Sequence, residues 1–263
     1  MPVIRKKSKL LIDVTENFRR LAQAPIVEAV IEIRARAESS WAESVVLERL
    51  TANLPDYPLF RSRREVRQEF KLKGSEPAEQ NIEDMGWYGL QFESADKLHV
   101  AQFLKDCFVF SRLQPYDHWA KFRGEALRLW QIHKAIAQPA EVNRLGVRFI
   151  NRLLLPDDFH IKDYLQTTPQ ASTDMGLLFS GFFHHETWDV PGYPYTINII
   201  KTIQPAQESP AGRIGLIFDI DVATMRPFEL RDELINQHLE EMRWLKNKVF
   251  FGSITEKALE GMR

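Results

Sequence analysis

Alternation of apolar and polar residues is clearest between Pro25 and Arg36. Apolar side chains recur at every second position from Val27 to Ile33, and mostly polar ones fall between them. A period of two is typical of a strand that buries one face, so we predict a strand over 25–36. Similar runs predict further strands over about 64–73, 86–93, 98–104, 107–113, 143–155, 176–188, 195–203 and 213–222.

A spacing of three to four between apolar residues predicts the helices. The first covers about 40–53, with Ser39 or Ser40 as its N-cap, and ends before Pro55. Asp117 is expected to cap a second helix that runs to residue 138, just before Pro139. Shorter or later helices are predicted over about 159–165, 227–250 and 255–262.

The order of these elements indicates an α+β protein built from two similar halves. Residues 94–97 and 105–106 have the composition of hairpin turns, which makes the predicted sheets antiparallel. Each half has strands followed by a long C-terminal helix, the order of a TATA-box-binding-protein-like or helix-grip unit. We divide the chain into an N-terminal extension (1–24), a first half (25–138) and a second half (139–263).

The first strands of the two halves carry complementary charges. If these strands pair about a pseudo-dyad, acidic residues of one could form cross-strand ion pairs with arginines of the other. Separate, solvated strand faces are an equally reasonable interpretation. The residues concerned are Glu28 and Glu32 on the first strand, and Arg144, Arg148 and Arg152 on the second.

Composition and motifs exclude several functional classes. A formal net charge of -1 gives no global attraction to nucleic acid or to anionic membranes. Cys107 is the only cysteine, which rules out an intrachain disulfide and suggests a cytoplasmic location, and we expect it to be buried. There is no P-loop, GxSxG elbow, HExxH motif or apolar run long enough to span a membrane. We therefore assign no catalytic residue and no cofactor.

Two carboxylates are candidates for ligand or metal binding. Asp219 and Asp221 are two apart on a predicted strand, which places both on one face. With His184 or Glu186 from a neighbouring strand, they could hold Mg²⁺ or divide acid and base roles. The more ordinary interpretation is a solvated pair of carboxylates, or a pairing with Arg148 or Arg152.

A basic row is the strongest charge feature. Such a row, near aromatic residues, could follow a phosphate backbone. Glu65 and Glu69 interrupt it, however, and charged rows commonly protect an edge strand, so we favour edge protection. The row consists of Arg61, Arg63, Arg64, Arg67, Lys71 and Lys73, with Val66 expected on the core side.

Four segments together resemble a sporadically distributed prokaryotic protein family of unknown function. They are 24–30, 145–152, 218–222 and the ending 238–262, and the similarity extends from about residue 25 to residue 262. The resemblance implies no activity, substrate or cofactor. It implies a prokaryotic origin, and the patchy distribution is typical of defence and toxin-antitoxin genes.

These observations favour a binding module over an enzyme. The leading hypothesis is a non-enzymatic protein that engages a protein partner or another copy of itself. Nucleic-acid binding through the basic row is the first alternative. A small metal-dependent enzyme or ligand binder centred on Asp219 and Asp221 is the second.

Overall fold

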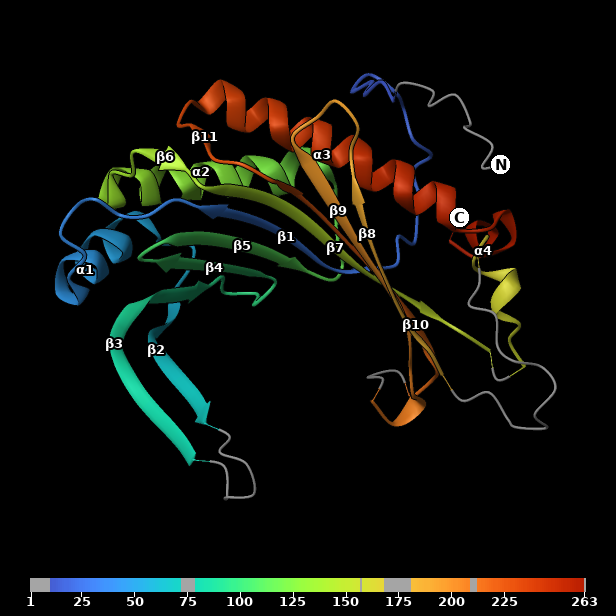
Figure 1. Ribbon diagram of the computed structural model, residues 1–263, viewed down its shortest axis with the longest axis horizontal. Helices are drawn as coiled ribbons and strands as arrows, with labels where there is room; N and C mark the ends of the chain where they lie inside the picture. The colour runs from blue at the N-terminus through green and yellow to red at the C-terminus, as the bar shows by residue number, and fades with distance from the viewer. Residues whose placement is uncertain (1–9, 72–78, 157, 168–180, 209–211, 263) are drawn as a thin grey trace.

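The computed structural model describes residues 10–71, 79–156, 158–167, 181–208 and 212–262. A single nine-stranded sheet dominates these residues, with the strand order β2-β3-β4-β5-β1-β7-β10-β9-β8. Every neighbouring pair of strands is antiparallel. The sheet bends into an arch, with α2 and α3 along its outer, convex side (Figure 1). The predicted α+β class with antiparallel strands is confirmed, but these strands form one large sheet instead of one sheet in each half.

Residues of the first half supply five strands and two helices. β1 alternates buried and more exposed residues, as its sequence predicts. The β2–β3 hairpin is longer than expected and extends beyond the helices on the inner side of the arch (Figure 1). The elements are β1 (Ile26–Arg34), α1 (Glu43–Asn53), β2 (Leu59–Lys71), β3 (Glu79–Glu93), β4 (His99–Leu104), β5 (Cys107–Leu113) and α2 (Trp119–Ala137).

Residues of the second half add four strands to the same sheet. A small two-stranded sheet, β11 with β6, lies apart from the main one. The helix expected over 159–165 is only the short 3-10 helix η1 (Ile161–Asp163). The other elements are β6 (Glu141–Val142), β7 (Arg144–Leu154), β8 (Phe183–Asp189), β9 (Tyr195–Gln204), η3 (Ala206–Glu208), β10 (Gly215–Thr224), β11 (Phe228–Glu229), α3 (Asp232–Ser253) and α4 (Glu256–Glu260).

β1 and β7 join the two parts of the chain at the centre of the sheet. Their register places Arg34 opposite Arg144, Glu32 opposite Gly146 and Val30 opposite Arg148. The strands expected in two halves therefore form one continuous sheet. Each of these central strands has the last main-sheet strand of its own half on the other side, β5 beside β1 and β10 beside β7.

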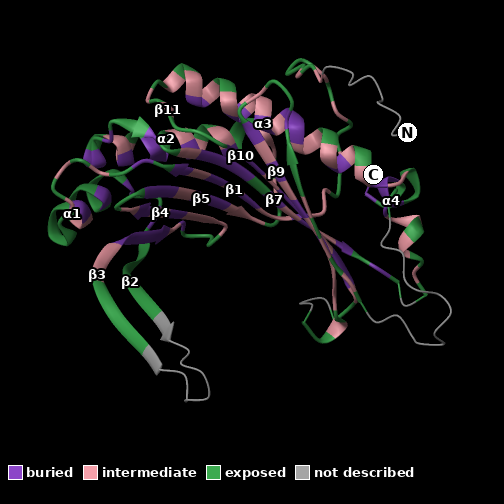
Figure 2. Ribbon diagram, viewed as in Figure 1, coloured by how far each residue is buried: buried purple, intermediate pink, exposed green. Residues whose placement is uncertain are grey.

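The hydrophobic core fills the space between the sheet and the helices. Figure 2 shows buried residues concentrated in the central strands and on the inner sides of α2 and α3. Cys107 is buried as expected, and this burial raises the pKa of its thiol. Val66, in contrast, was expected on the core side and is 57% exposed. The reason is geometric, because this part of the hairpin extends past the helices that would cover it.

Two predicted helix caps are also wrong. α1 begins after Ala42, which makes no side-chain capping bond, while the Ser39 hydroxyl donates to the Ile136 carbonyl oxygen at 2.6 Å. His118, rather than Asp117, caps α2 by accepting a hydrogen bond from the Lys121 amide. Asp117 pairs instead with the Lys121 ammonium at 2.5 Å.

Candidate functional site

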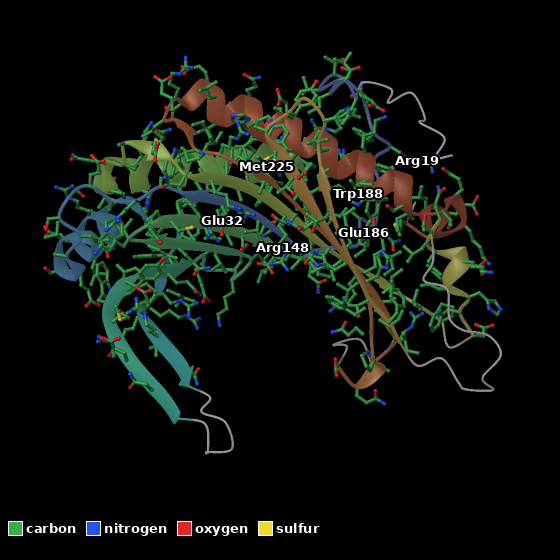
Figure 3. All side chains as sticks on the ribbon, viewed as in Figure 1. Arg19, Glu32, Arg148, Glu186, Trp188 and Met225 are labelled. Carbon is green, nitrogen blue, oxygen red and sulfur yellow. The ribbon has the colours of Figure 1, made fainter. Side chains whose placement is uncertain are left out.

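The inner face of the arch is polar, because strand alternation sends one set of side chains to the helices and the other set away from them. On β7 the buried Val147 and Phe149 face the helices, and Arg148 between them faces the inner side. No helix covers this inner face in Figure 1. Glu32 and Arg148, labelled in Figure 3, both belong to it. We call this surface the concave face.

A hollow of about 420 Å³ lies at the middle of the concave face. Five strands contribute to it, from β1 through β7, β10 and β9 to β8, so its walls come from both parts of the chain. Charged residues line one part and amide, imidazole and aliphatic groups line the rest. The lining residues are Val30, Glu32, Arg34, Arg144, Gly146, Arg148, His185, Asn198, Ile200, Asp219 and Asp221.

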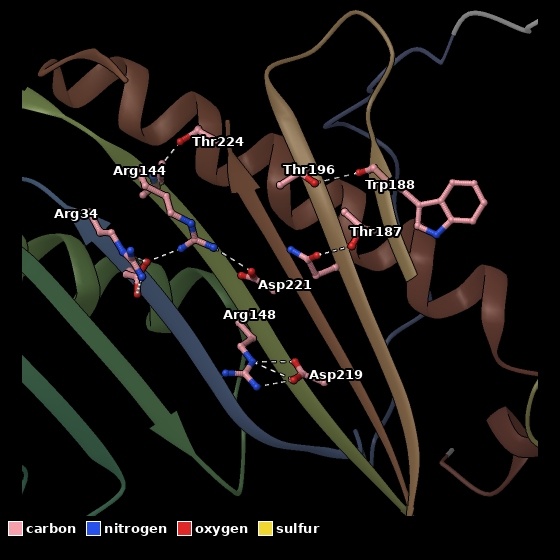
Figure 4. Close-up of polar contacts among 12 residues, drawn as sticks. Arg34, Arg144, Arg148, Thr187, Trp188, Thr196, Asp219, Asp221 and Thr224 are labelled. Atoms are coloured by element: carbon pink, nitrogen blue, oxygen red, sulfur yellow. Dashed lines mark hydrogen bonds and ion pairs between the residues drawn. The ribbon is translucent and has the colours of Figure 1, made fainter. Parts of the chain in front are cut away.

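Arg144 bridges two carboxylates from different strands (Figure 4). Its Nη1 donates to Glu32 of β1, and its Nη2 donates to Asp221 of β10 at 2.9 Å. Arg34 contacts the same Glu32 carboxylate at 2.9 Å. Gly146 makes room for this arrangement, since an added Cβ atom there would lie 2.7 Å from Arg144 Nη1. The bridge therefore ties β1, β7 and β10 together across the hollow.

Arg148 forms the second ion pair of the hollow. Its Nε lies 2.9 and 3.1 Å from the two carboxylate oxygens of Asp219, and its Nη2 lies 2.5 Å from one of them. The Asp219 side chain is 9% exposed, whereas that of Arg148 is 48% exposed. This bidentate contact raises the pKa of Arg148. Asp219 thus fixes the guanidinium group while leaving one edge of it open to solvent.

Burial raises the pKa of Asp221, although the nearby Arg144 opposes that shift. Asp219 and Asp221 do share one face, and each has an arginine as its partner. Across the part of the chain that the structure describes, no group of three or more His, Cys, Asp or Glu side chains is placed to hold a metal ion. The arrangement supports a structural role for both carboxylates better than a metal site.

His184 and Glu186 do not join this pair of carboxylates. His185 is opposite Ile200, which is opposite Asp219, and residues directly opposite on antiparallel strands share a face. His184 is opposite Lys201 instead, on the side of the sheet where Phe218 is buried. His184, Lys201 and Trp188 all contact Glu186 there, at 2.7, 3.2 and 2.8 Å. The grouping of His184 and Glu186 with Asp219 and Asp221 is therefore wrong, and His185 faces the hollow.

The predicted cross-strand pairs form only in part. Glu32 pairs with Arg144, but Arg148 pairs with Asp219 rather than with β1. Glu28 makes no ion pair with any described residue. Arg152 donates a long hydrogen bond, 3.5 Å, to the Gln114 side chain.

Residues of the basic row mostly have partners on the neighbouring strand β3. Arg61 pairs with Glu93, and Arg63 donates to the Gln91 side chain. Arg64 pairs with Asp84 at 2.8 Å. Arg67 is opposite Glu83 in the strand register. Lys71 ends β2, and Lys73 lies outside the described residues. Arg61 and Arg64 are therefore neutralised by carboxylates of β3, whereas the amide partner of Arg63 carries no charge.

Comparison with known proteins adds no family or relative. No protein-family profile matches the chain, and no curated protein matches it significantly. Within the described residues, no helix is both long and apolar enough to cross a membrane.

Sequence reasoning missed several residues of the hollow. Arg34, Asn198 and Ile200 lie on the concave face next to the predicted charges. Alternation from Glu32 could have found Arg34, because the two are two positions apart on β1. The place of Asn198 and Ile200 depends on the register between β9 and β10, which no local pattern indicates.

Proposed function

We propose that this protein is a non-enzymatic interaction module that binds a protein partner on its concave face. The observation that carries this proposal is an uncovered sheet face with a central hollow whose charged side chains are already held in place by one another. Side chains that are fixed before binding lose less conformational entropy when a partner arrives. A pre-organised polar surface of this kind is suited to recognition of a partner.

Arg148 is the side chain best placed to anchor a partner. Asp219 holds its Nε and Nη2 atoms, while its Nη1 has no hydrogen bond to another described residue. Arginine is enriched among the residues that dominate binding energy at protein interfaces. A carboxylate or a backbone carbonyl of the partner would suit this open guanidinium edge, and Ile200 and Val30 would supply apolar contact beside it.

The two alternatives have less support. Nucleic-acid binding needs cations that are free to meet phosphates, and the arginines of the basic row and of the hollow mostly have partners within the chain. A metal-dependent enzyme would need Asp219 and Asp221 to release Arg148 and Arg144. Both alternatives remain hypotheses, and the experiment below separates nucleic-acid binding from partner binding.

We also propose that the two parts of the chain descend from one repeated unit of TATA-box-binding-protein-like or helix-grip order. Its support is that β1 and β7 meet at the centre, each beside the last main-sheet strand of its own half, and that a long helix, α2 or α3, comes after that strand in each half. A prokaryotic origin, a defence context and a cytoplasmic location stay predictions. The genes that flank this one would test the first two directly.

The test is recovery of a partner from the organism that encodes the protein. We expect tagged protein to retain a second protein, and a photo-crosslinking residue at Asn198 to attach to it. Ile200→Trp, which fills the hollow without breaking an ion pair, and Arg148→Glu should each reduce recovery at least tenfold. Arg128→Glu is the matched control, because Arg128 forms an exposed pair with Glu125 on α2, away from the concave face.

Circular dichroism of each variant establishes that it is folded. Recovery of the protein alone, or equal recovery with Ile200→Trp, would contradict the proposal. Retention of nucleic acid that is lost in Arg61→Ala and Arg63→Ala proteins would favour the first alternative instead.

A further inference from the structure

A second hollow, of about 300 Å³, lies on the opposite side of the sheet from the concave face. Its walls come from the N-terminal segment 18–26, the start of α2 and the last turns of α3. Arg19, labelled in Figure 3, belongs to the N-terminal segment that runs beside α3. Aromatic rings form much of the lining, including Phe18, Trp119 and Phe251. We call this hollow the helix-side cavity.

Lys246 of α3 lines this cavity without a counter-ion. Its ammonium nitrogen lies 3.8 Å from the centre of the Phe149 ring, and it makes no hydrogen bond or ion pair with any described residue. Other lysines on the same side of the molecule are paired, for example Lys248 with Glu16 at 2.7 Å and Lys134 with Asp232 at 2.8 Å. Lys246 therefore differs from its neighbours.

Positive charge prevails around the cavity. Besides Lys246, its lining contains Arg19, Arg20 and Arg243, against one carboxylate, Asp117. Arg19 pairs with Glu256 at 3.0 Å and Arg243 with Glu240 at 3.3 Å, whereas Arg20 makes no ion pair with any described residue. Asp117 is taken by Lys121 at 2.5 Å, so it does not neutralise Lys246. Arg243 lies close enough to Lys246 to repel its ammonium group. An anion entering this space would meet two cations that have no ion-pair partner among the described residues, Lys246 and Arg20.

A tyrosine adds an uncharged donor to the same space. The Tyr116 hydroxyl has no hydrogen-bond partner among the described residues, and its ring packs edge-on against Phe149 at 5.6 Å. Tyr116 also lines the cavity. Burial raises the pKa of Tyr116, so the hydroxyl keeps its proton and can donate a hydrogen bond to a ligand.

The free-energy cost of keeping the Lys246 ammonium group among apolar side chains also favours an anionic ligand. Half-buried among apolar side chains, Lys246 has a pKa lowered to about 7, chiefly by burial and then by repulsion from Arg243. A bound carboxylate would restore the charged form and supply the missing counter-ion. The aromatic walls would meanwhile bury an apolar body attached to that carboxylate.

We propose that the helix-side cavity binds a small organic anion, a carboxylate on an aromatic or aliphatic body, with Lys246 contacting the carboxylate and Tyr116 and Arg243 as further donors. This site is separate from the concave face, and its existence does not depend on the proposed function. Phe149 forms the floor beneath the ammonium group, and the N-terminal segment forms one wall.

Isothermal titration calorimetry tests the proposal with benzoate, hexanoate and 3-phenylpropanoate, and with 3-phenylpropan-1-ol as an uncharged analogue. We expect at least one of the three acids to bind with one-to-one stoichiometry, and the alcohol to bind at least tenfold more weakly. Lys246→Met should weaken acid binding at least tenfold, and Tyr116→Phe severalfold. Lys257→Met is the control. Lys257 is an exposed lysine of α4 that pairs with Asp163 of η1, and this variant should bind like the unaltered protein.

Lys246→Gln serves as a second variant if the methionine variant fails to fold. Equal acid binding by the Lys246 variants, equal binding of acid and alcohol, or no binding of any acid at millimolar concentration would overturn the proposal. Treatment with 3-phenylpropanal and borohydride, followed by mass spectrometry, tests a different chemistry. A stable adduct on Lys246 without acid binding would identify a nucleophilic amine and also overturn the anion site.

Discussion

Charged side chains on the two sides of β7 differ in whether carboxylates of the same chain neutralise them. On the concave face, Arg144 and Arg148 are each held by carboxylates of the same chain. On the helix side, Lys246 lies over the Phe149 ring with no carboxylate beside it. A charge that its own chain neutralises is held in one position and can contact a partner only through the edge that stays open, as Arg148 does beside Asp219. A charge that the chain leaves unpaired is available to a ligand, and this difference separates our two proposals.

Phe149→Ala, at the ring that lies beneath Lys246 on the helix side, should cause the largest loss of stability. Phe149 is fully buried and packs against Tyr116, Trp119 and Phe122, so its truncation leaves a large void. We expect a loss of about 4 kcal/mol in the free energy of unfolding, measured by urea denaturation. Phe149→Leu should cost clearly less, because it fills more of the space. Equal losses would mean that the ring's contacts, rather than its volume, stabilise this region.

Asp219→Ala tests the paired side, with a smaller expected effect. Removing the carboxylate leaves Arg148 without its bidentate partner, and we expect a loss of about 2 kcal/mol in the free energy of unfolding. Asp219→Asn should lose less, since an amide oxygen can still accept from Arg148. If Asp219→Ala matched the unaltered protein in urea and Mg²⁺ then stabilised only the latter, the metal hypothesis would regain support.

Lys246→Met tests the unpaired lysine of the helix side through the pH dependence of stability. The folded-state pKa of about 7 is below the ordinary 10.5, so between these values the unfolded chain binds a proton that the folded protein does not. This lysine therefore destabilises the fold at pH 7, and the penalty falls as the pH rises toward 10.5. We compare the free energy of unfolding of Lys246→Met with that of the unaltered protein. This difference should favour the variant by about 1 kcal/mol more at pH 7 than at pH 9, after allowance for solvent screening.

That comparison uses urea denaturation of both proteins at each pH. Arg243, Tyr116, His118 and Asp117 also line the cavity and are present in both proteins, so the two proteins differ only at residue 246. A constant difference between the two proteins from pH 7 to pH 9 would show that Lys246 is protonated normally.

Arg64→Ala should have the smallest effect. Its ion pair with Asp84 is more than half exposed on both sides, so water and salt screen it. We expect a change of about 0.5 kcal/mol or less in thermal or urea unfolding. A loss comparable to that of Asp219→Ala would mean that the hairpin arm contributes more to the fold than its exposure indicates.

Local sequence patterns predicted the positions of the strands better than they predicted the register between strands or the partners of individual side chains. The alternation from Val27 to Ile33 identified β1, and the spacing of Asp219 and Asp221 placed both on one face. The same reasoning could not decide which of the adjacent His184 and His185 shares that face, since this depends on register between strands. Ser39 was a plausible N-cap by residue type, but its hydroxyl donates a hydrogen bond to the Ile136 carbonyl oxygen of α2 instead.

The helix-side cavity was beyond the reach of sequence patterns. It gathers residues near 18, 116 and 246, and no periodicity links three segments so far apart. Lys246 in a helix sequence looks like any solvated lysine. Only packing shows that its ammonium group lies on an aromatic ring without a counter-ion.

The central pairing of β1 with β7 also has a consequence for how the chain reaches its fold. Glu32 and Arg144 are 112 residues apart, so the middle of the sheet has a high contact order. During synthesis β5 can cover one edge of β1 early, but the other edge stays open until β7 leaves the ribosome. The centre of the finished sheet is thus formed late, when two distant segments pair, and a nascent chain that stalls before residue 144 leaves one edge of β1 unpaired.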